Sequence, residues 1–176
     1  GKFLERWYFR LYRHCSFWTD APSTISELVE RGIPRDQCTA IPCPVVKDKH
    51  LVTKAERKEK VPTYVFISRV VRMKGIEEII KAFAFIARTQ ETAKLWIVGS
   101  GEELYMKELR QQMQEYGIAK RVEFFGTVSE KRKFELLSRS HLLLHASVKE
   151  GWGLVVLEAA SVGTPSVVYN VGGLRD

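Results

Sequence analysis

The sequence predicts an α/β protein built on a doubly wound parallel sheet. From Thr63 onward, short apolar segments alternate with longer segments whose apolar residues recur at helical spacing. The short segments are rich in Val, Ile, Leu or Phe and too continuously apolar for a sheet with one face in water, as is typical of strands buried on both faces. Strands that alternate with helices in this way imply parallel strands joined by crossover helices.

Five segments have the length and composition of strands. They are Tyr64–Ser68, Leu95–Val98, Val122–Phe125, Leu142–His145 and Ser166–Tyr169. Apolar spacing predicts four helices between them, around Ile76–Ile86, Tyr105–Tyr116, Phe134–Leu137 and Leu154–Ser161. Ser129 is a predicted N-cap, and Gly117 and Gly163 stand where helices are expected to end. Ligands of such sheets bind outside the carboxyl ends of the strands.

The first 62 residues follow a different pattern. Aromatic and basic residues predict a helix over Lys2–Arg13, and Ser16–Thr19 fits a lone strand. The capping-box sequence Thr24-Ile25-Ser26-Glu27 predicts a short helix that ends near Gly32. This segment has too little apolar material to fold alone, so we expect it to complete another domain.

The chain is therefore divided into three parts. Residues 1–46 are assigned to the tail of an N-terminal domain and the crossing from it, 47–62 to a charged linker, and 63–176 to the main domain, which is expected to be incomplete. Lys54–Lys60 fits a solvated loop. A chain that starts at Gly1 without Met is expected to be a piece of a longer one.

Composition narrows the classes of function. A net charge of +7 is compatible with phosphate-bearing ligands, but basic and acidic residues are interleaved, and no nucleic-acid partner is predicted. There is no apolar run long enough to cross a bilayer and no signal-peptide pattern. Three cysteines, Cys15, Cys38 and Cys43, form an odd set without C-x-x-C spacing, which favours a reducing cytoplasm over a disulfide framework.

Two acidic residues enclose an apolar stretch near the end of the chain. Glu150 and Glu158 are separated by the uncharged run Gly-Trp-Gly-Leu-Val-Val-Leu. The run beginning at Leu154 is apolar almost all round, as expected of a helix packed inside a protein. A carboxylate there needs a partner, so Glu158 is expected to face a cleft and hold a polar ligand. Glu150 precedes the helix, in a loop whose glycines let backbone approach a ligand, and we predict a site for hydroxyls and phosphate oxygens.

A basic loop follows the first predicted strand. Arg69 and Lys74, together with the helix N-terminus after Gly75, would clamp a diphosphate through a planar fork, a point charge and backbone N–H groups. Alternatively, these basic residues merely face water. Their position at the carboxyl end of a strand favours the diphosphate.

Other motifs give weaker evidence of function. Val98-Gly99-Ser100-Gly101 lacks the third glycine of a dinucleotide fingerprint and follows the second strand, so a tight turn near the ligand is favoured. His141 and His145 have the i, i+4 spacing of a metal pair but border or lie on a strand, and no metal site is predicted. The chain has neither a Walker loop nor a G-x-S-x-G motif.

An ordered set of segments resembles the donor domain of retaining glycosyltransferases of the GT-B fold, the large group 1 family (family 4-like). They are Ser68-Arg69 with Lys74-Gly75, Val98–Gly101, Val122–Gly126, and Glu150–Leu154 with Glu158-Ala159. The most specific element is the E-x7-E pattern with its Gly-aromatic-Gly insert. The resemblance covers about residues 16–176, and Pro44 with the segment before it is similar to the family's interdomain crossing.

The resemblance implies a role for each matching residue. Arg69 and Lys74 would hold the donor diphosphate and stabilise the leaving nucleotide. Glu150 would contact hydroxyls of the transferred sugar, and Glu158 the ribose hydroxyls. The remaining implied donor-binding residues are Gly151, Trp152, Gly153, Leu154, Gly126, Thr127 and Val128. No cofactor and no essential metal are implied; the substrate would be a UDP- or GDP-sugar, and the acceptor a glycan or a lipid-linked molecule.

The chain departs from the family pattern in places. Ser68 stands where Gly is frequent and Trp152 where Phe is frequent. Most of the acceptor domain is missing, which implies that this stretch alone binds the donor without transferring sugar and acts with the rest of its own chain. A sucrose-phosphate-type synthase and a non-catalytic binding or regulatory module remain alternatives. The helix over Lys2–Arg13 would either pack in the other domain or lie on the cytoplasmic face of a membrane.

Overall fold

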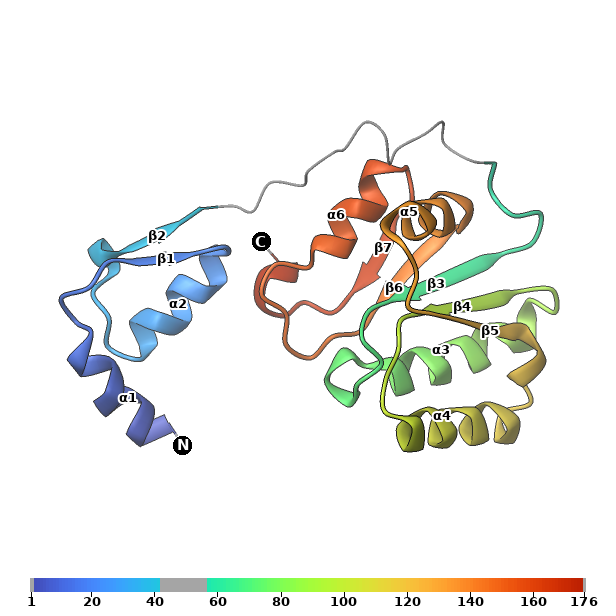
Figure 1. Cartoon of the computed structure of the whole chain (residues 1–176), viewed down its shortest axis with the longest axis horizontal. Coiled ribbons are helices and arrows are strands. Elements are labelled where there is room, and N and C mark those ends of the chain that lie inside the picture. The colour runs from blue at the N-terminus through green and yellow to red at the C-terminus, as the bar shows by residue number, and fades with distance from the viewer. Residues whose placement is uncertain (1, 42–56, 176) are drawn as a thin grey trace. The chain divides into compact units, whose positions relative to one another are not determined.

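The computed structural model describes residues 2–41 and 57–175, with side chains from residue 7 onward. They fall into two compact units (Figure 1). The N-terminal unit comprises the described residues of Gly1–Pro44, Lys149–Gly153 and Asn170–Asp176. The sheet unit comprises those of Val45–Val148 and Leu154–Tyr169. The prediction that residues 1–46 belong to a separate domain stays a prediction.

The sheet unit contains five parallel strands in the order β5-β4-β3-β6-β7. Their bounds are β3 Thr63–Ile67, β4 Lys94–Val98, β5 Val122–Gly126, β6 Leu142–His145 and β7 Ser166–Val168. Each lies within one residue of its predicted position. The parallel, doubly wound sheet predicted from the sequence is thereby confirmed.

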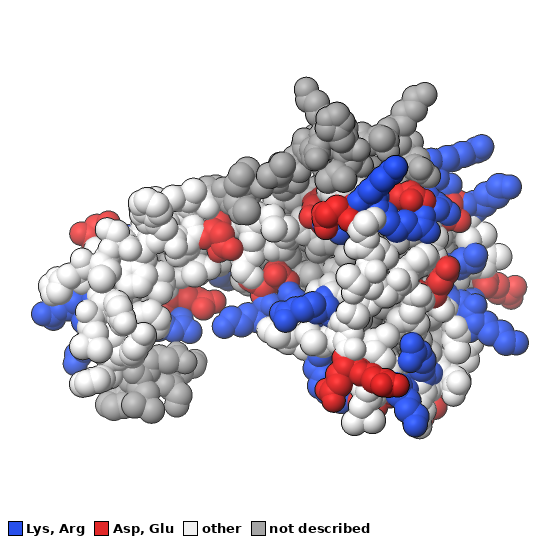
Figure 2. Space-filling model, viewed as in Figure 1, with Lys and Arg blue, Asp and Glu red and all other residues white. Residues whose placement is uncertain are grey.

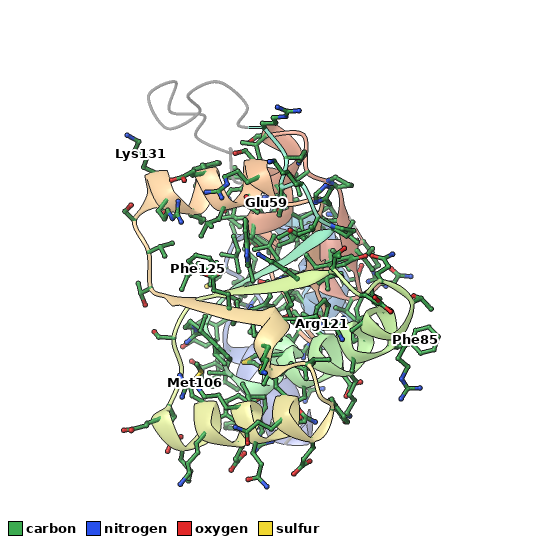
Figure 3. The ribbon with its side chains drawn as sticks, turned by 90° about the vertical axis from the view of Figure 1, so that its right-hand side faces the viewer. Glu59, Phe85, Met106, Arg121, Phe125 and Lys131 are labelled. Atoms are coloured by element: carbon green, nitrogen blue, oxygen red, sulfur yellow. The ribbon has the colours of Figure 1, made fainter. Side chains whose placement is uncertain are left out.

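Two helices cover each face of this sheet (Figures 1 and 3). On one face lie α3 (Ile76–Thr89) and α4 (Glu103–Glu115), which form a core with the side chains of Phe66 and Ile97. On the other lie α5 (Glu130–Arg139) and α6 (Leu154–Ser161). Burial on both faces explains why the inner strands β3, β4 and β6 are rich in apolar residues. Among the described residues, no helix has the length and apolarity needed to cross a membrane.

The predicted helix ends are confirmed. The Ser129 hydroxyl accepts a hydrogen bond from the backbone N–H of Arg132 at 3.3 Å, as an N-cap does. Gly117 and Gly163 follow α4 and α6 with φ angles of 68° and 76°. This left-handed conformation favours glycine after a helix.

The N-terminal unit corrects two predictions. Its helices are α1 (Lys2–Leu11) and α2 (Pro22–Glu30), and its strands are β1 (Phe17–Thr19) and β2 (Cys38–Ala40). The strand predicted as lone is paired in parallel with β2, which the sequence did not predict. The prediction that a capping box begins the helix at Thr24 is wrong. Pro22 occupies the first turn of α2, and Ala21 is an N-cap without a side-chain hydrogen bond.

Short 3-10 helices complete the described structure. They are η1 (Arg35–Gln37), η2 (Arg72–Lys74), η3 (Ala119–Arg121) and η4 (Gly172–Leu174). Of these, η2 and η4 lie in the loops that follow β3 and β7. The carboxyl ends of β3 and β7 are therefore followed by a short helical turn.

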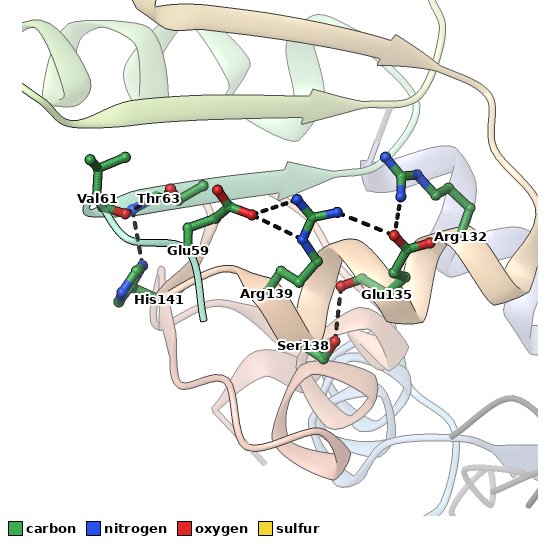
Figure 4. Close-up of polar contacts among 8 residues, drawn as sticks. All are labelled: Glu59, Val61, Thr63, Arg132, Glu135, Ser138, Arg139 and His141. Carbon is green, nitrogen blue, oxygen red and sulfur yellow. Dashed lines mark hydrogen bonds and ion pairs between the residues drawn. The ribbon is translucent and has the colours of Figure 1, made fainter. Parts of the chain in front are cut away.

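The prediction of a solvated loop over Lys54–Lys60 is wrong for Lys58 and Glu59. Residues 42–56, including most of the predicted linker and Cys43, lie outside the described residues. Lys58 Nζ donates to Ser140 O at 2.6 Å and to Thr164 Oγ1 at 2.7 Å. Glu59 Oε1 accepts from Arg139 Nη2 at 2.5 Å (Figure 4). These contacts bind the segment to α5 and to the loop before β7, so residues 58 and 59 belong to the sheet unit.

Candidate functional site

The topological switch point of the sheet lies between β3 and β6. The chain places β4 on one side of β3 and β6 on the other, so the connections after β3 and β6 leave in opposite directions. A crevice forms at such a point outside the carboxyl ends of the strands. The loop after β3 carries Arg69 and Lys74, and the loop after β6 leads to Glu150.

Arg69 and Lys74 occupy the loop between β3 and α3. The Arg69 side chain is exposed, and Lys74 is half-buried in η2. Gly75 follows with a φ of 69°, and α3 begins at the next residue. The structure therefore places Lys74 directly before the N-terminus of a 14-residue helix, where an anion is stabilised, and Arg69 earlier in the same loop.

Arg72, in the same loop, has a different role. Its guanidinium donates to Glu77 Oε1 at 2.5 Å and to Glu108 Oε2 at 2.6 Å. It also lies 4.7 Å from the ring centroid of Tyr105. Burial, with the negative charge of Glu77 nearby, raises the pKa of Tyr105 to about 12, so its phenol stays neutral. Arg72 thus anchors the loop to α3 and α4, a role that the sequence did not predict.

The glycines after β4 serve close packing against this loop. A Cβ at Gly99 would lie 1.9 Å from Ser68 O, and one at Gly101 would lie 2.2 Å from Val70 O. The Val70 N–H donates to Ser100 O at 2.8 Å. The neighbour that requires glycine here is the backbone after β3, and the tight turn near the ligand stays a prediction.

The loop after β5 joins the same set of contacts. Gly99 N–H donates to Gly126 O at 2.7 Å. The hydroxyls of Ser100 and Thr127 are hydrogen-bonded at 3.0 Å. Gly126, Thr127 and the following Val128, the residues expected to border a base, therefore adjoin the turn that packs on the Arg69 loop.

The loop after β6 packs on the other side of the Arg69 loop. The Val148 N–H donates to Met73 O at 3.1 Å, and the buried Ser147 hydroxyl donates to the same oxygen at 3.4 Å. A Cβ at Gly75 would lie 2.0 Å from Ala146 O. Four loops, after β3, β4, β5 and β6, thus form one continuous set of contacts at the carboxyl edge of the sheet.

Glu158 lies on α6 and has a partner that the sequence did not predict. Its Oε1 accepts a hydrogen bond from Lys133 Nζ of α5 at 2.8 Å. The helix itself is less buried than expected: Ala159 is buried, whereas Leu154 and Leu157 expose 42% and 38% of their surface. The prediction of a helix packed inside the protein is wrong, because α6 covers one face of the sheet and turns its other side outward.

The loop that carries Glu150 is packed against η4 within the N-terminal unit. Glu150 O accepts from the Gly173 N–H at 3.1 Å. A Cβ at Gly173 would lie 1.9 Å from Gly151 O, and one at Gly153 would lie 2.4 Å from Leu174 Cδ2. Gly172 and Gly173 lie in the loop after β7, and their close approach to the Glu150 loop was not predicted from the sequence.

The structure thus brings part of the predicted site together. The loops at the carboxyl edge of the sheet contain Arg69, Lys74 and residues 126–128. The same sheet unit contains Leu154 and Glu158 on α6. Glu150, Gly151, Trp152 and Gly153 belong to the N-terminal unit. Convergence of both groups on one ligand stays a prediction.

The two histidines with i, i+4 spacing, His141 and His145, lie within the fold of the sheet unit. His141 Nδ1 accepts from the Thr63 N–H at 3.1 Å (Figure 4), and His145 is buried at the end of β6. No group of three or more potential metal-ligating side chains is present among residues 2–41 and 57–175. On the face shown in Figure 2, basic and acidic side chains are interspersed rather than gathered into one basic patch.

Curated relatives resemble the chain over its second part. The N-acetyl-alpha-D-glucosaminyl L-malate synthase of Bacillus anthracis is 37% identical over 112 residues, which are 64% of this chain and 28% of that protein. The phosphatidylinositol N-acetylglucosaminyltransferase gpi3 subunit of Schizosaccharomyces pombe is 32% identical over 114 residues, 65% of this chain and 25% of that protein. The chain thus spans about a quarter of the length of these relatives.

Solved structures share the fold. HepE from Anabaena in complex with UDP has a TM-score of 0.78 at 20% identity, over 99% of this chain and 50% of that one. Sucrose-phosphate synthase from Thermosynechococcus elongatus has a TM-score of 0.71 at 26% identity, over 90% of this chain and 41% of that one. Such neighbours are GT-B glycosyltransferases, and the architecture of this chain is that of their fold.

One protein-family model matches the chain over most of its length. The model described as glycosyl transferases group 1 matches residues 48–176, more than half of the chain. It includes the Arg69 loop, the loop after β5 and the E-x7-E segment. The chain therefore belongs to the group 1 glycosyltransferase family.

Proposed function

We propose that the protein transfers a sugar from a nucleotide-diphosphate sugar to an acceptor with retention of the anomeric configuration. The observation that carries this proposal is the pair of cations, Arg69 and Lys74, in the loop that leads from β3 to α3 at the switch point. A diphosphate is the group that a planar guanidinium, an ammonium and free backbone N–H groups bind together. Membership of the family supports the same chemistry.

Each site residue then has a defined task. When the bond from the anomeric carbon to the diphosphate breaks, Arg69 and Lys74 stabilise the negative charge that develops on the leaving group. Glu150 accepts hydrogen bonds from the transferred sugar, and Glu158 from the ribose. The N–H groups of Gly153 and Leu154, at the start of α6, bind phosphate oxygens. The acceptor oxygen bonds to the anomeric carbon, and its proton leaves with the diphosphate.

We propose UDP as the nucleotide of the donor, in preference to GDP. The structural neighbour HepE was solved with UDP and with UDP-glucose, and this likeness supports a uridine donor. The alternative of a non-catalytic module is disfavoured because Arg69, Lys74, Glu150 and Glu158 are all present.

The acceptor and the location are proposals of the same kind. A glycan or a lipid-linked acceptor fits the relatives, one of which is named for phosphatidylinositol. We place the protein in the cytoplasm and favour packing of α1 in the rest of the protein; a peripheral membrane contact is the alternative, since Trp7 and Tyr8 expose 63% and 54% of their surface. Co-sedimentation with anionic liposomes that Trp7→Ala abolishes would support this contact, and unchanged sedimentation would contradict it.

Calorimetric titration of UDP, GDP and ADP into the protein tests the proposed function. Lys74→Ala should weaken UDP binding by about tenfold or more, the effect of losing a charge-assisted hydrogen bond. Lys94→Ala is the matched control, because this exposed lysine lies at the opposite, amino end of β4. Failure of every nucleotide to bind, or an equal effect of both substitutions, would contradict the proposal.

A further inference from the structure

A lysine joins the two helices that follow the candidate site loops. Lys133 Nζ, on α5, lies 2.8 Å from Glu158 Oε1 on α6 and 2.8 Å from Glu130 Oε2 on its own helix. The side chains of Lys133 and Glu158 expose only 14% and 18% of their surface, whereas Glu130 exposes 64%. The contact between the helices is therefore the sheltered one.

The lysine remains a cation in this position. Burial alone would lower the pKa of Lys133, but hydrogen bonds to Glu130 and Glu158 outweigh it and raise the pKa. A charged ammonium with two carboxylates stays fixed between them, because each hydrogen bond involves an ionised partner. Its sheltered partner Glu158 is the residue to which a ribose was assigned.

We propose that Lys133 is a positioning residue for the donor nucleotide: it holds Glu158 through Oε1 and leaves Oε2 to accept the vicinal ribose hydroxyls. The proposal rests on the proposed function. Oε2 accepts no hydrogen bond from the residues that the structure describes. An ionised carboxylate has about four lone-pair sites, so a ribose binds without displacing the lysine.

The charge of Lys133 has a second effect at this site. A carboxylate close to a bound diphosphate repels it, and this repulsion weakens the binding of the whole nucleotide. The ammonium neutralises the carboxylate of Glu158 without occupying its second oxygen. Lys133 also connects α5, which follows the loop 126–128, to α6, so it holds the carboxylate in register with the loop expected to border the base.

Binding of UDP and of 2′,3′-dideoxy-UDP to the full chain separates positioning from general charge effects. The quantity measured is the affinity for UDP divided by the affinity for 2′,3′-dideoxy-UDP. Loss of a cation weakens the binding of both ligands, whereas misplacement of Glu158 weakens the binding of UDP only. Lys133→Met should lower this ratio by about tenfold, the effect of a charge-assisted hydrogen bond. Lys133→Arg, which keeps the cation, should retain most of the ratio.

Two matched controls accompany these variants. Lys131→Met removes an exposed charge from the same helix (Figure 3), and Glu130→Gln removes the exposed partner of Lys133. Both should leave the ratio within about twofold. If Lys133→Met does not fold, Lys133→Gln measures the same loss of charge with a shorter polar side chain.

The outcomes distinguish this inference from the proposed function. An unchanged ratio in Lys133→Met or Lys133→Gln, or tighter UDP binding than in the wild type, would overturn the role of Lys133 while leaving the nucleotide site intact. A wild-type protein that binds neither ligand would contradict the proposed function itself. A fall in the ratio that Lys133→Arg restores would support both.

Discussion

Substitution of Gly75 tests whether the loops at the switch point are held together as the structure indicates. Gly75 has a φ of 69° and ends η2 immediately before α3. A Cβ added to it would lie 2.0 Å from the oxygen of Ala146 and 2.6 Å from its carbonyl carbon. Because the obstacle is backbone, Gly75→Ala must displace the loop after β3 from the loop after β6.

Gly117 supplies a matched control. Its φ of 68° is nearly the same, but a Cβ added there would meet nothing within 4 Å. Gly117→Ala should therefore cost only the left-handed conformation, about 1–2 kcal/mol. Gly75→Ala should cost this amount plus about 1–3 kcal/mol for the overpacking, so the free energy of unfolding should fall by about 2–5 kcal/mol.

Urea unfolding followed by circular dichroism measures both variants. The midpoint should fall much further for Gly75→Ala than for Gly117→Ala, with the dependence on urea unchanged. UDP affinity should also fall in Gly75→Ala, because Arg69 and Lys74 lie in the displaced loop, and should be unchanged in Gly117→Ala. Equal destabilisation by the two substitutions would refute the packing of the two loops.

Three further predictions concern other contacts. Ser129→Ala should lower the free energy of unfolding by about 0.5–2 kcal/mol in urea, because α5 loses its N-cap; no loss would contradict the cap. The hydrogen bond from Arg132, with that from Arg139, lowers the pKa of Glu135 below 4.5. This partly exposed network of Glu135 with the two arginines stabilises the folded protein by about 0.5–1 kcal/mol above pH 4.5. The stabilisation is lost as the pH falls through the pKa of Glu135 in the folded protein. Glu135→Gln should therefore destabilise the protein at pH 7 and not in strong acid; equal destabilisation at both would contradict the network. Gly173→Ala should weaken binding of a UDP-sugar by displacing the Glu150 loop, whereas Gly163→Ala, whose Cβ meets nothing within 4 Å, should not; equal affinities would contradict the packing.

The sheet and its helices could be predicted because their signals are local. Each strand is rich in apolar residues, and the helix ends carry their own markers, such as Ser129 and Gly117. The basic loop was predicted because the alternation of elements places it after a strand. Residues 150–158 were singled out by the spacing of their two acidic residues, by the apolar run and glycines between them, and by the family resemblance.

The features that were missed depend on residues far apart in the chain. The contact of Lys58 with Thr164 spans 106 positions, and that of Glu59 with Arg139 spans 80. Local composition assigned these charges to a solvated loop. Similarly, β2 has only three residues and exists because β1 offers it an edge, and Lys133 meets Glu158 only through the packing of α5 on α6.

A crystal structure of the protein with UDP tests the central claim most directly. The account predicts that the diphosphate lies within hydrogen-bonding distance of Arg69 and Lys74, and that the ribose hydroxyls bind Glu158. UDP bound elsewhere, with these side chains directed to unrelated surfaces, would contradict it.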